Sequence, residues 1–424
     1  MSTHLDTLCV QAGWQPKNGE PRVLPIYQST TFKYDSSAEV GDLFDLKCAG
    51  HFYTRLSNPT TEAVENKIAA LEGGVGALMT SAGQAAALIA ILNICNSGDH
   101  FIASSALYGG STNLFSVTLK KMGIEVTYVD PMASDHLLCA ALRPNTRLIF
   151  GETIANPALT LLDIERFANF AHANGLPLIV DNTFPTPVLC RPMDFGAAIV
   201  TYSTSKYLDG HAVALGGMIV DSGRFDWKAS NQFPGLTEPD PSYHGLIYTE
   251  AFGAAAYIVK ARVQLMRDLG STPSPMNAFL LNLGMETLHL RMMRHCQNAE
   301  TIAAFLQKHP AVSWVNYPGL PGAPQADLVK KYLPKGTCGV ISFGVRGGRE
   351  AAVRFMDSLH LVAIVVHVAD ARTGVLHPAS TTHRQLTDEQ LAAAGIRPEM
   401  IRLSVGIEHP DDILADLNQA LTQA

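Results

Sequence analysis

Residues 197–207, Ala-Ala-Ile-Val-Thr-Tyr-Ser-Thr-Ser-Lys-Tyr, join an apolar run to a lysine set among small hydroxyl side chains. The run 197–202 predicts a buried strand, which places Lys206 just beyond the strand's carboxyl end. Ligand crevices of open α/β sheets lie at such ends. A lysine that loses part of its hydration there can be a neutral amine, able to form a Schiff base with an aldehyde cofactor.

Outward from this run, short apolar segments alternate with helical patterns. The predicted helices are 64–71, 84–95, 112–122 and 163–174, and the predicted strands are 75–80, 100–104, 124–129, 147–151, 178–181 and 197–202. Strands interleaved with helices indicate parallel βαβ units whose sheet is covered on both faces. The predicted class is therefore α/β with a mostly parallel central sheet.

Three regions are predicted along the chain. Residues 1–60 lack regular periodicity and are expected to form an N-terminal arm, 61–264 a large domain, and 265–424 a smaller α/β domain. The smaller domain is predicted to hold helices 350–358 and 411–422 and strands 339–345, 361–368 and 401–405. The stretch 223–245 interrupts the alternation, and a long structured loop of this kind is usually functional or interfacial.

The composition narrows the classes of function. Charged residues make up only 16% of the 424 residues and hydrophobic ones 47%, which favours a large permanent interface and hence a homo-oligomer. A net charge of −7 without long basic runs argues against nucleic-acid or membrane-surface binding. Seven widely spaced cysteines without a Cys-x-x-Cys predict free thiols and no metal site. Without an apolar run long enough to span a membrane, or a secretory signal, a cytoplasmic protein is expected.

Several polar side chains are expected beside Lys206. Asp181 ends another apolar run, and its carboxylate could hold a pyridine nitrogen protonated. Ser203 and Ser205 could donate hydroxyl groups to a phosphate. Together these residues suggest pyridoxal phosphate (PLP) as the cofactor.

Two turns carry further candidates. Gly83 and Gln84 open a predicted helix, where backbone N–H groups can approach an anion; most such turns bind nothing. Tyr108, before Gly109 and Gly110, could stack on a flat ring or merely stand in a turn. The chain has no Gly-x-Gly-x-x-Gly, which weighs against an NAD-dependent enzyme.

The remaining candidates are ambiguous on their own. Asn156 could contact a ring hydroxyl or cap the turn before Pro157. Arg402, alternating with apolar residues, offers a planar fork for a carboxylate or makes a structural ion pair. Tyr53 and Arg55 lie in the arm, where a solvated loop is the plainer reading.

From about Thr7 to its C-terminus, the chain resembles the Cys/Met-metabolism PLP-dependent enzymes. The resemblance is strongest to their O-acetylhomoserine sulfhydrylase subgroup. It is carried by the motifs Gly-Glu-Thr-Ile at 151–154, Phe-Pro-Gly-Leu-Thr-Glu-Pro-Asp-Pro-Ser-Tyr-His-Gly at 233–245 and His-Pro-Ala-Ser-Thr-Thr-His at 377–383. It implies the PLP-dependent aminotransferase-like fold (fold type I).

The resemblance also implies roles for single residues. Lys206 would carry the cofactor, Asp181 would pair with its ring nitrogen, Tyr108 would stack on its ring, and Asn156 would contact its hydroxyl. The residues implied at the phosphate are Gly83, Gln84, Ser203 and Ser205, with Tyr53 and Arg55 reaching it from the neighbouring subunit.

Two positions bear on the substrate. The resemblance implies that Arg402 binds the α-carboxylate. His367 stands where relatives have serine or asparagine near that carboxylate, and could tune the pH response or serve only as a structural hydrogen bonder. Gly110 occupies the place of a cysteine found in many γ-lyases, as it does in the sulfhydrylases.

The implied reaction is a γ-replacement that converts O-acetyl-L-homoserine and sulfide, or a thiol, to homocysteine, or a thioether, and acetate. Lys206 would move the substrate protons, with Tyr108 and Tyr53 as further candidates near the leaving group. Methionine γ-lyase and cystathionine γ-synthase chemistry are the alternatives. A dimer of dimers with shared active sites is implied.

Overall fold

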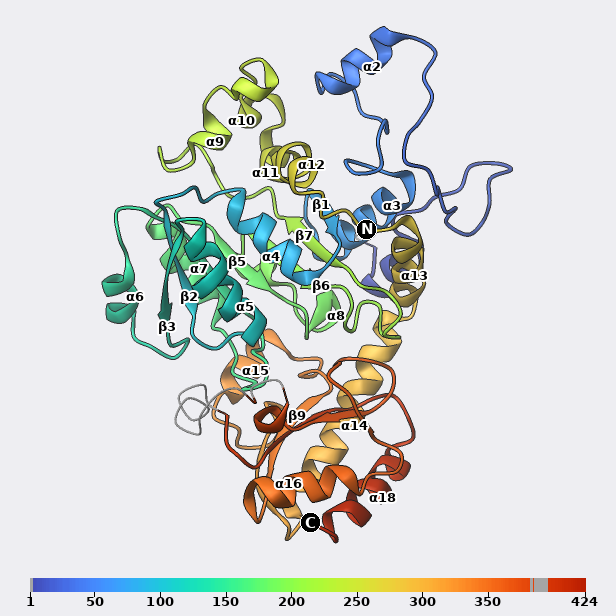
Figure 1. Ribbon diagram of the computed structural model, residues 1–424, viewed down its shortest axis with the longest axis vertical. Coiled ribbons are helices and arrows are strands. Elements are labelled where there is room, and N and C mark those ends of the chain that lie inside the picture. The colour runs from blue at the N-terminus through green and yellow to red at the C-terminus, as the bar shows by residue number, and fades with distance from the viewer. Residues whose placement is uncertain (1–2, 382–383, 385–395) are drawn as a thin grey trace.

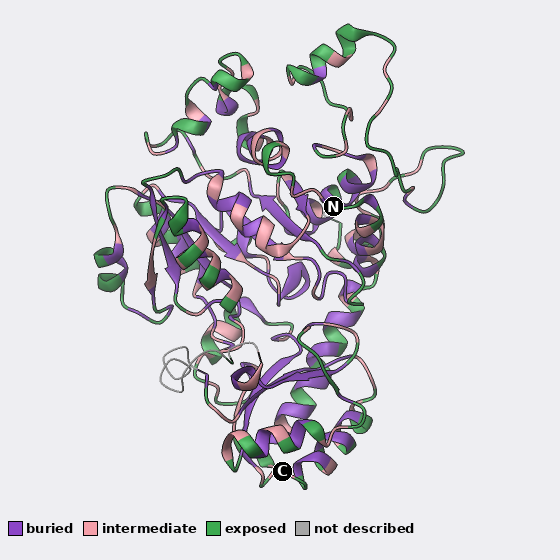
Figure 2. Cartoon of the chain, viewed as in Figure 1, coloured by how far each residue is buried: buried purple, intermediate pink, exposed green. Residues whose placement is uncertain are grey.

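Two β-sheets with packed helices make up the protein in the computed structural model, which describes residues 3–381, 384 and 396–424 (Figure 1). Two residues of the third quoted motif, Thr382 and His383, lie outside the described residues. Figure 2 shows most strands of the two sheets buried, apart from edge strands such as β10 (Ala363–Ile364), whereas helix α2 (Ser37–Phe44) is largely exposed. Among the described residues, none of the helices has the length and apolarity needed to cross a membrane.

The larger sheet has seven strands in the order β1-β7-β6-β5-β4-β2-β3. Only β7 runs against its neighbours, pairing antiparallel with both β1 and β6, so the predicted mostly parallel sheet is confirmed. The sequence pattern missed β7. The strands are β1 (Gly76–Thr80), β2 (His100–Ser104), β3 (Glu125–Val129), β4 (Thr146–Glu152), β5 (Leu178–Asp181), β6 (Ile199–Ser203) and β7 (Gly217–Asp221).

Helices cover both faces of this sheet. Helix α3 (Pro59–Glu72) begins where the Asn58 side chain accepts a hydrogen bond from the Thr60 N–H, and it ends at Gly73, whose φ of 73° suits glycine. Its apolar side joins one buried cluster, and α4 (Gly83–Leu92) joins the cluster on the other face. The other helices here include α5 (Gly109–Asn113), its π-helical continuation η1 (Leu114–Leu119), α6 (Asp135–Ala141), α7 (Ile164–Ala173), α8 (Thr186–Leu189) and α11 (Ala256–Lys260).

The smaller sheet has five strands in the order β10-β11-β12-β9-β8. Its strands are β8 (Val312–Asn316), β9 (Val340–Val345), β10 (Ala363–Ile364), β11 (Gly374–Leu376) and β12 (Met400–Ser404), packed with α16 (Gly348–Asp357) and α18 (Pro410–Leu421). Of the predicted strand 361–368, only Ala363 and Ile364 form a strand, and the prediction was wrong for the other residues. The apolar side chains at 364–366 are exposed at the sheet edge, where β11 is the one strand of the described residues that pairs with β10.

The first 60 residues contain more structure than their pattern predicts. They hold α1 (Leu5–Gln11) as well as α2, whose first turn is capped by Ser36 accepting a hydrogen bond from the Glu39 N–H. Short helices also occur in and after the stretch 223–245, namely α9 (Pro234–Thr237) and α10 (Tyr248–Ala251). The division into an arm and two domains stays a prediction.

One long helix links the two sheets. Helix α14 (Leu288–Lys308) follows α13 (Pro275–Glu286) and descends from the larger sheet to the smaller one (Figure 1). Leu288 and Met292 belong to the core of the larger sheet, whereas Ile302 and Leu306 belong to the core of the smaller one. The same helix is therefore part of two cores.

Helix α13 approaches the backbone that follows Lys206. A β-carbon added at Gly284 would lie 2.2 Å from the Asp209 carbonyl oxygen, closer than any real contact. We expect Gly284→Ala to lower the free energy of unfolding by about 1–3 kcal/mol, because the helix or the loop must shift. Thermal or urea unfolding measures this effect.

The matched control is Gly41→Ala in α2, where an added β-carbon meets nothing within 4 Å. Alanine there should leave stability unchanged or raise it, by up to about 1 kcal/mol, through its helix propensity. Equal effects of the two substitutions would contradict the packing argument.

Candidate active site

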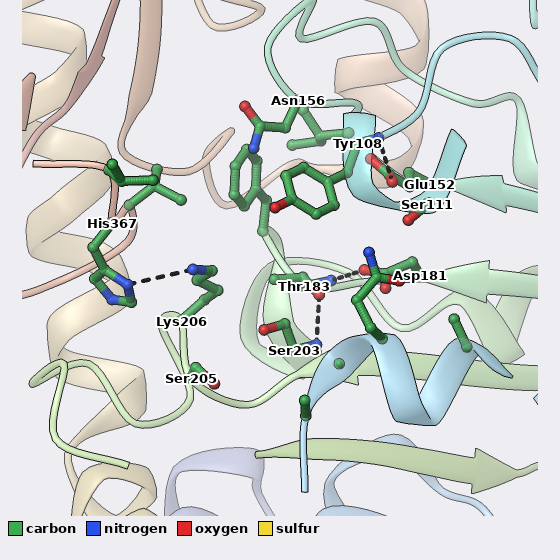
Figure 3. Close-up of a pocket in the computed structure, with 18 of the residues that line it drawn as sticks. Tyr108, Ser111, Glu152, Asn156, Asp181, Thr183, Ser203, Ser205, Lys206 and His367 are labelled. Carbon is green, nitrogen blue, oxygen red and sulfur yellow. Dashed lines mark hydrogen bonds between the residues drawn. The ribbon is translucent and has the colours of Figure 1, made fainter. Parts of the chain in front are cut away.

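A cavity of about 440 Å³ lies at the carboxyl ends of β4, β5 and β6, with the first turn of α4 on one side and the smaller sheet on another (Figure 3). The structure brings ten of the predicted site residues to its wall. They are Gly83, Gln84, Tyr108, Asn156, Asp181, Ser203, Ser205, Lys206, His367 and Arg402.

Lys206 reaches the cavity from the turn that follows β6. Its Nζ lies 3.3 Å from Nδ1 of His367, as drawn in Figure 3. Burial lowers the pKa of Lys206 to about 8, and the nearby Arg402 guanidinium adds to this effect. At pH 7 about a tenth of this amine is therefore neutral, and the neutral form is the one that acts as a nucleophile or base.

Asp181 is the last residue of β5. Its Oδ1 accepts a hydrogen bond from the Thr183 N–H at 3.0 Å, and its Oδ2 accepts one from the Thr201 hydroxyl at 3.3 Å. Burial raises the pKa of this carboxyl, while these hydrogen bonds act in the opposite direction. A cation in the cavity would stabilise the ionised form.

The first turn of α4 approaches Ser203 closely. A β-carbon on Gly83 would lie 2.7 Å from Cβ of Ser203, so only glycine allows this approach without a shift. The N–H groups at the start of α4 lie beside the strand end that carries Ser203, an arrangement suited to an anion. The Ser205 hydroxyl is engaged by Gly216, whose N–H it accepts at 3.0 Å.

Arg402 enters from β12 of the smaller sheet. Its Nη2 donates to the Val366 carbonyl at 2.9 Å and its Nη1 to Oδ1 of Asn156 at 3.5 Å. Its Nε is buried and has no hydrogen-bond partner among the described residues, and burial lowers its pKa to about 10. The guanidinium therefore still carries its charge at neutral pH and has a donor to spare for an acceptor in the cavity.

Tyr53 and Arg55 lie apart from this cavity. They line a second hollow formed by the arm together with Tyr243, His244 and Arg267. The Arg55 guanidinium lies 5.0 Å from the centre of the Tyr53 ring, which is 41% exposed. This placement argues against a role for Tyr53 and Arg55 at the phosphate in the cavity of their own chain. Their role at a neighbouring subunit stays a prediction.

Sequence reasoning left Glu152 and Thr183 out of the site residues. Glu152 accepts a hydrogen bond from the Tyr108 N–H at 2.7 Å and pairs in register with Asp181 (Figure 3). Burial, and next the Asp181 charge, raise its pKa. The Thr183 hydroxyl accepts a hydrogen bond from the Ser203 N–H at 2.8 Å. The available signal was position, because both residues lie at or just beyond the carboxyl end of a strand.

Comparison with known proteins places this geometry in a family. A model of the Cys/Met metabolism PLP-dependent enzymes matches residues 6–422. The chain belongs to this family. The predicted family and fold are therefore confirmed, and PLP is the cofactor of this PLP-dependent family.

Individual family members are similar over their whole length. Homocysteine synthase of Schizosaccharomyces pombe is 45% identical and covers 100% of this chain and 99% of its own. O-acetyl-L-homoserine sulfhydrylase of Leptospira meyeri is also 45% identical, covering 98% and 96%. A crystal structure from Campylobacter jejuni, assigned as an O-acetylhomoserine (thiol)-lyase and carrying a pyridoxyl-lysine monophosphate, superposes with a TM-score of 0.96 at 36% identity, covering 99% and 100%.

The cavity of this PLP-dependent family member fits the cofactor on its own geometry. A partly neutral lysine, a buried strand-end carboxylate and a glycine-opened helix start converge on it. The unpartnered Nε of Arg402 stands on the opposite, smaller-sheet side.

Substitution of Gly83 tests the helix start. Gly83→Ala should weaken PLP affinity roughly tenfold or more, because the added methyl group displaces the first turn of α4 from Ser203. Equilibrium titration of cofactor-free protein with PLP, followed by absorbance, measures the change. Gly41→Ala serves as the control, and unchanged affinity of the Gly83 variant would contradict an anion site at this turn.

Proposed function

We propose that the protein catalyses a γ-replacement in which O-acetyl-L-homoserine and sulfide, or a thiol, yield homocysteine, or a thioether, and acetate. The observation that carries the proposal is the cavity in which Lys206, Asp181 and Arg402 converge. The names of the full-length relatives, homocysteine synthase and O-acetyl-L-homoserine sulfhydrylase, support the choice of substrate. This activity belongs to methionine and cysteine biosynthesis.

Each side of the cavity has a proposed role in holding the cofactor. Lys206 would attach it, Asp181 would face its ring nitrogen, Tyr108 would stack on its ring and Asn156 would contact its hydroxyl. Phosphate would be bound by the backbone of Gly83 and Gln84 with Ser203 and Ser205. The hydrogen bond from Arg402 to Asn156 suggests that Asn156 also orients the arginine.

The residues of the chain divide the chemistry among them. Bound PLP withdraws electron density from the α-carbon of an amino acid. Arg402 holds the α-carboxylate through its guanidinium, and His367 is a further candidate on the same wall. The Lys206 amine removes the α-proton and returns protons later in the cycle. Tyr108, which lines the cavity and is 49% exposed, is the residue we propose for guiding protons near the leaving acetate.

We also propose a homo-oligomer, a dimer of dimers, with active sites completed between subunits. Tyr53 and Arg55 lie outside the cavity of their own chain, and this placement supports a role for them at the cavity of a neighbouring subunit. Exposed apolar side chains on α13 and α14, Leu283 and Leu290 among them, offer a surface for such contacts. A cytoplasmic location stays a prediction.

Substrate profiling tests the reaction. Purified protein should release acetate from O-acetyl-L-homoserine only with sulfide or a thiol present, and Lys206→Ala should lose both turnover and the cofactor's visible absorbance. Chromatography of the amino-acid products measures the outcome. Turnover of methionine alone would favour a γ-lyase instead, and cystathionine formed from cysteine a cystathionine γ-synthase. Full activity of the Lys206 variant would overturn the scheme.

Mixing two inactive variants tests the shared site. Arg55→Ala and Lys206→Ala should each be inactive or nearly so when pure. Co-expressed subunits should regain activity, because one kind of interface then combines an intact Lys206 with the partner's intact Arg55. Absence of any recovery in mixed oligomers isolated with two affinity tags would contradict shared sites.

A further inference from the structure

Two apolar side chains line the cavity and are nonetheless largely exposed to solvent. Leu215 is 69% exposed and comes from the loop between β6 and β7, whereas Val366 is 68% exposed and follows β10. An apolar surface that stays in water gains free energy when an apolar group of a ligand covers it. Leu215 and Val366 together are called the apolar mouth.

Hydrogen bonds hold the backbone of both residues in place. Nδ2 of Asn277, in α13, donates to the Leu215 carbonyl at 3.0 Å, and Nη2 of Arg402 donates to the Val366 carbonyl at 2.9 Å. Both bonds use the backbone, so they leave the apolar side chains free to contact a ligand. Because Arg402 is the residue proposed to bind the α-carboxylate, Val366 adjoins the place of the bound amino acid.

The cations on the cavity wall already have roles in the proposed function. In the part of the chain that the structure describes, the lysine and arginine side chains lining the cavity are Lys206 and Arg402, which are proposed to hold the cofactor and the α-carboxylate. Burial, and next the Lys206 charge, lower the pKa of His367, so this ring is neutral at neutral pH. Arg55 of the partner subunit is proposed to bind the phosphate. Among these residues, a second substrate with its own carboxylate, such as cysteine, would therefore lack a cationic partner.

We propose that the second substrate is an uncharged alkyl thiol whose alkyl group packs on Leu215 and Val366. The inference deepens the proposed function and rests on it. In the net reaction the thiol sulfur forms a bond to the γ-carbon of O-acetyl-L-homoserine. The bond from that carbon to the acetate oxygen breaks and leaves its electron pair on acetate, and the thiol proton passes to solvent. The product is an S-alkyl homocysteine. Sulfide has no carbon atoms with which to cover the apolar mouth, so the mouth favours thiols over sulfide.

The rates of a series of thiols test this selection. With O-acetyl-L-homoserine, kcat/KM per unit of thiolate concentration should rise about two- to threefold for each methylene added between methanethiol and butanethiol, because each methylene covers more of the apolar mouth. 3-Mercaptopropionate, which is similar in length to butanethiol but carries a carboxylate, should react roughly tenfold more slowly. Chromatography of the thioether products measures both effects. A flat series, or equal rates for the charged and uncharged thiols, would overturn the proposal.

Two substitutions assign the effect to the apolar mouth. Leu215→Asn and Val366→Thr each replace an apolar side chain by a polar one of similar size, so the gain per methylene should fall below about 1.5-fold. Leu361→Asn is the matched control, because Leu361 is also exposed but lies outside the residues that line the cavity. The control should keep the wild-type series. A wild-type series in both mouth variants would place the alkyl group elsewhere and contradict the assignment.

Coverage by a neighbouring subunit is the competing explanation for the apolar mouth. It predicts that Leu215→Asn and Val366→Thr dissociate the oligomer, whereas the proposal predicts an intact oligomer with a flattened thiol series. Analytical ultracentrifugation of the PLP-loaded variants measures the oligomeric state. Dissociation together with a wild-type thiol series would overturn the proposal.

Binding of S-alkyl homocysteines separates this inference from the proposed function. L-methionine, L-ethionine and S-butyl-L-homocysteine carry the alkyl group on an amino acid, and their affinity for the PLP-loaded protein is measured by absorbance without any acyl substrate. Affinity should rise about two- to threefold per methylene, and Leu215→Asn should remove most of this rise.

The two readouts fail in different ways. If no nucleophile releases acetate from O-acetyl-L-homoserine but affinity rises with alkyl length, the proposed reaction is wrong and the alkyl site at the apolar mouth is supported. If sulfide releases acetate but neither rate nor affinity rises with alkyl length, the proposed reaction holds and the alkyl site is overturned.

Discussion

Parallel pairing of β4, β5 and β6 is the constraint on which the site depends. Register sets Glu152 opposite Asp181 and Asp181 opposite Thr201, so β4 and β5 end at one level and β6 ends two residues beyond it. Side chains that are far apart in the sequence are thereby brought to one edge without any specific attraction between them. Two buried carboxyl groups side by side raise each other's cost of ionisation, which a positively charged ligand ring would offset. The strand register that brings the polar groups together therefore also makes binding of a cation favourable at this site.

The sequence allowed much of this arrangement to be predicted, because strand-end position is visible in the pattern of apolar runs. Lys206, Asp181 and Ser203 could be placed in this way, and family resemblance chose between the open readings of Tyr108 and Arg402. The sequence pattern could not show which strands, distant in the sequence, pair with one another. Strand β7 escaped notice because its apolar run follows a Gly-rich turn, and an antiparallel insertion has no helix before it to mark the alternation.

Hydrogen bonds between side chains that are distant in the sequence could not be predicted either. Glu152 supports Tyr108 across 44 residues, and Asn156 meets Arg402 across 246, so neither partner is visible locally. The arm illustrates a different limit. Helices α1 and α2 are short and weakly patterned, and α2 is only marginally buried, so intrinsic propensity alone gave no usable signal.

Helix α14 rigidly connects the two cores between which the cavity lies. At about 1.5 Å per residue its 21 residues span roughly 30 Å as one rod, with one end sealed into each core. Lys206 and Asp181 line the cavity from the larger sheet, whereas Arg402 lines it from β12 of the smaller sheet. A molecule bound in the cavity therefore contacts residues from both sheets at once. Its binding free energy therefore adds to the stability of the folded chain, because the bound molecule contacts residues from both sheets.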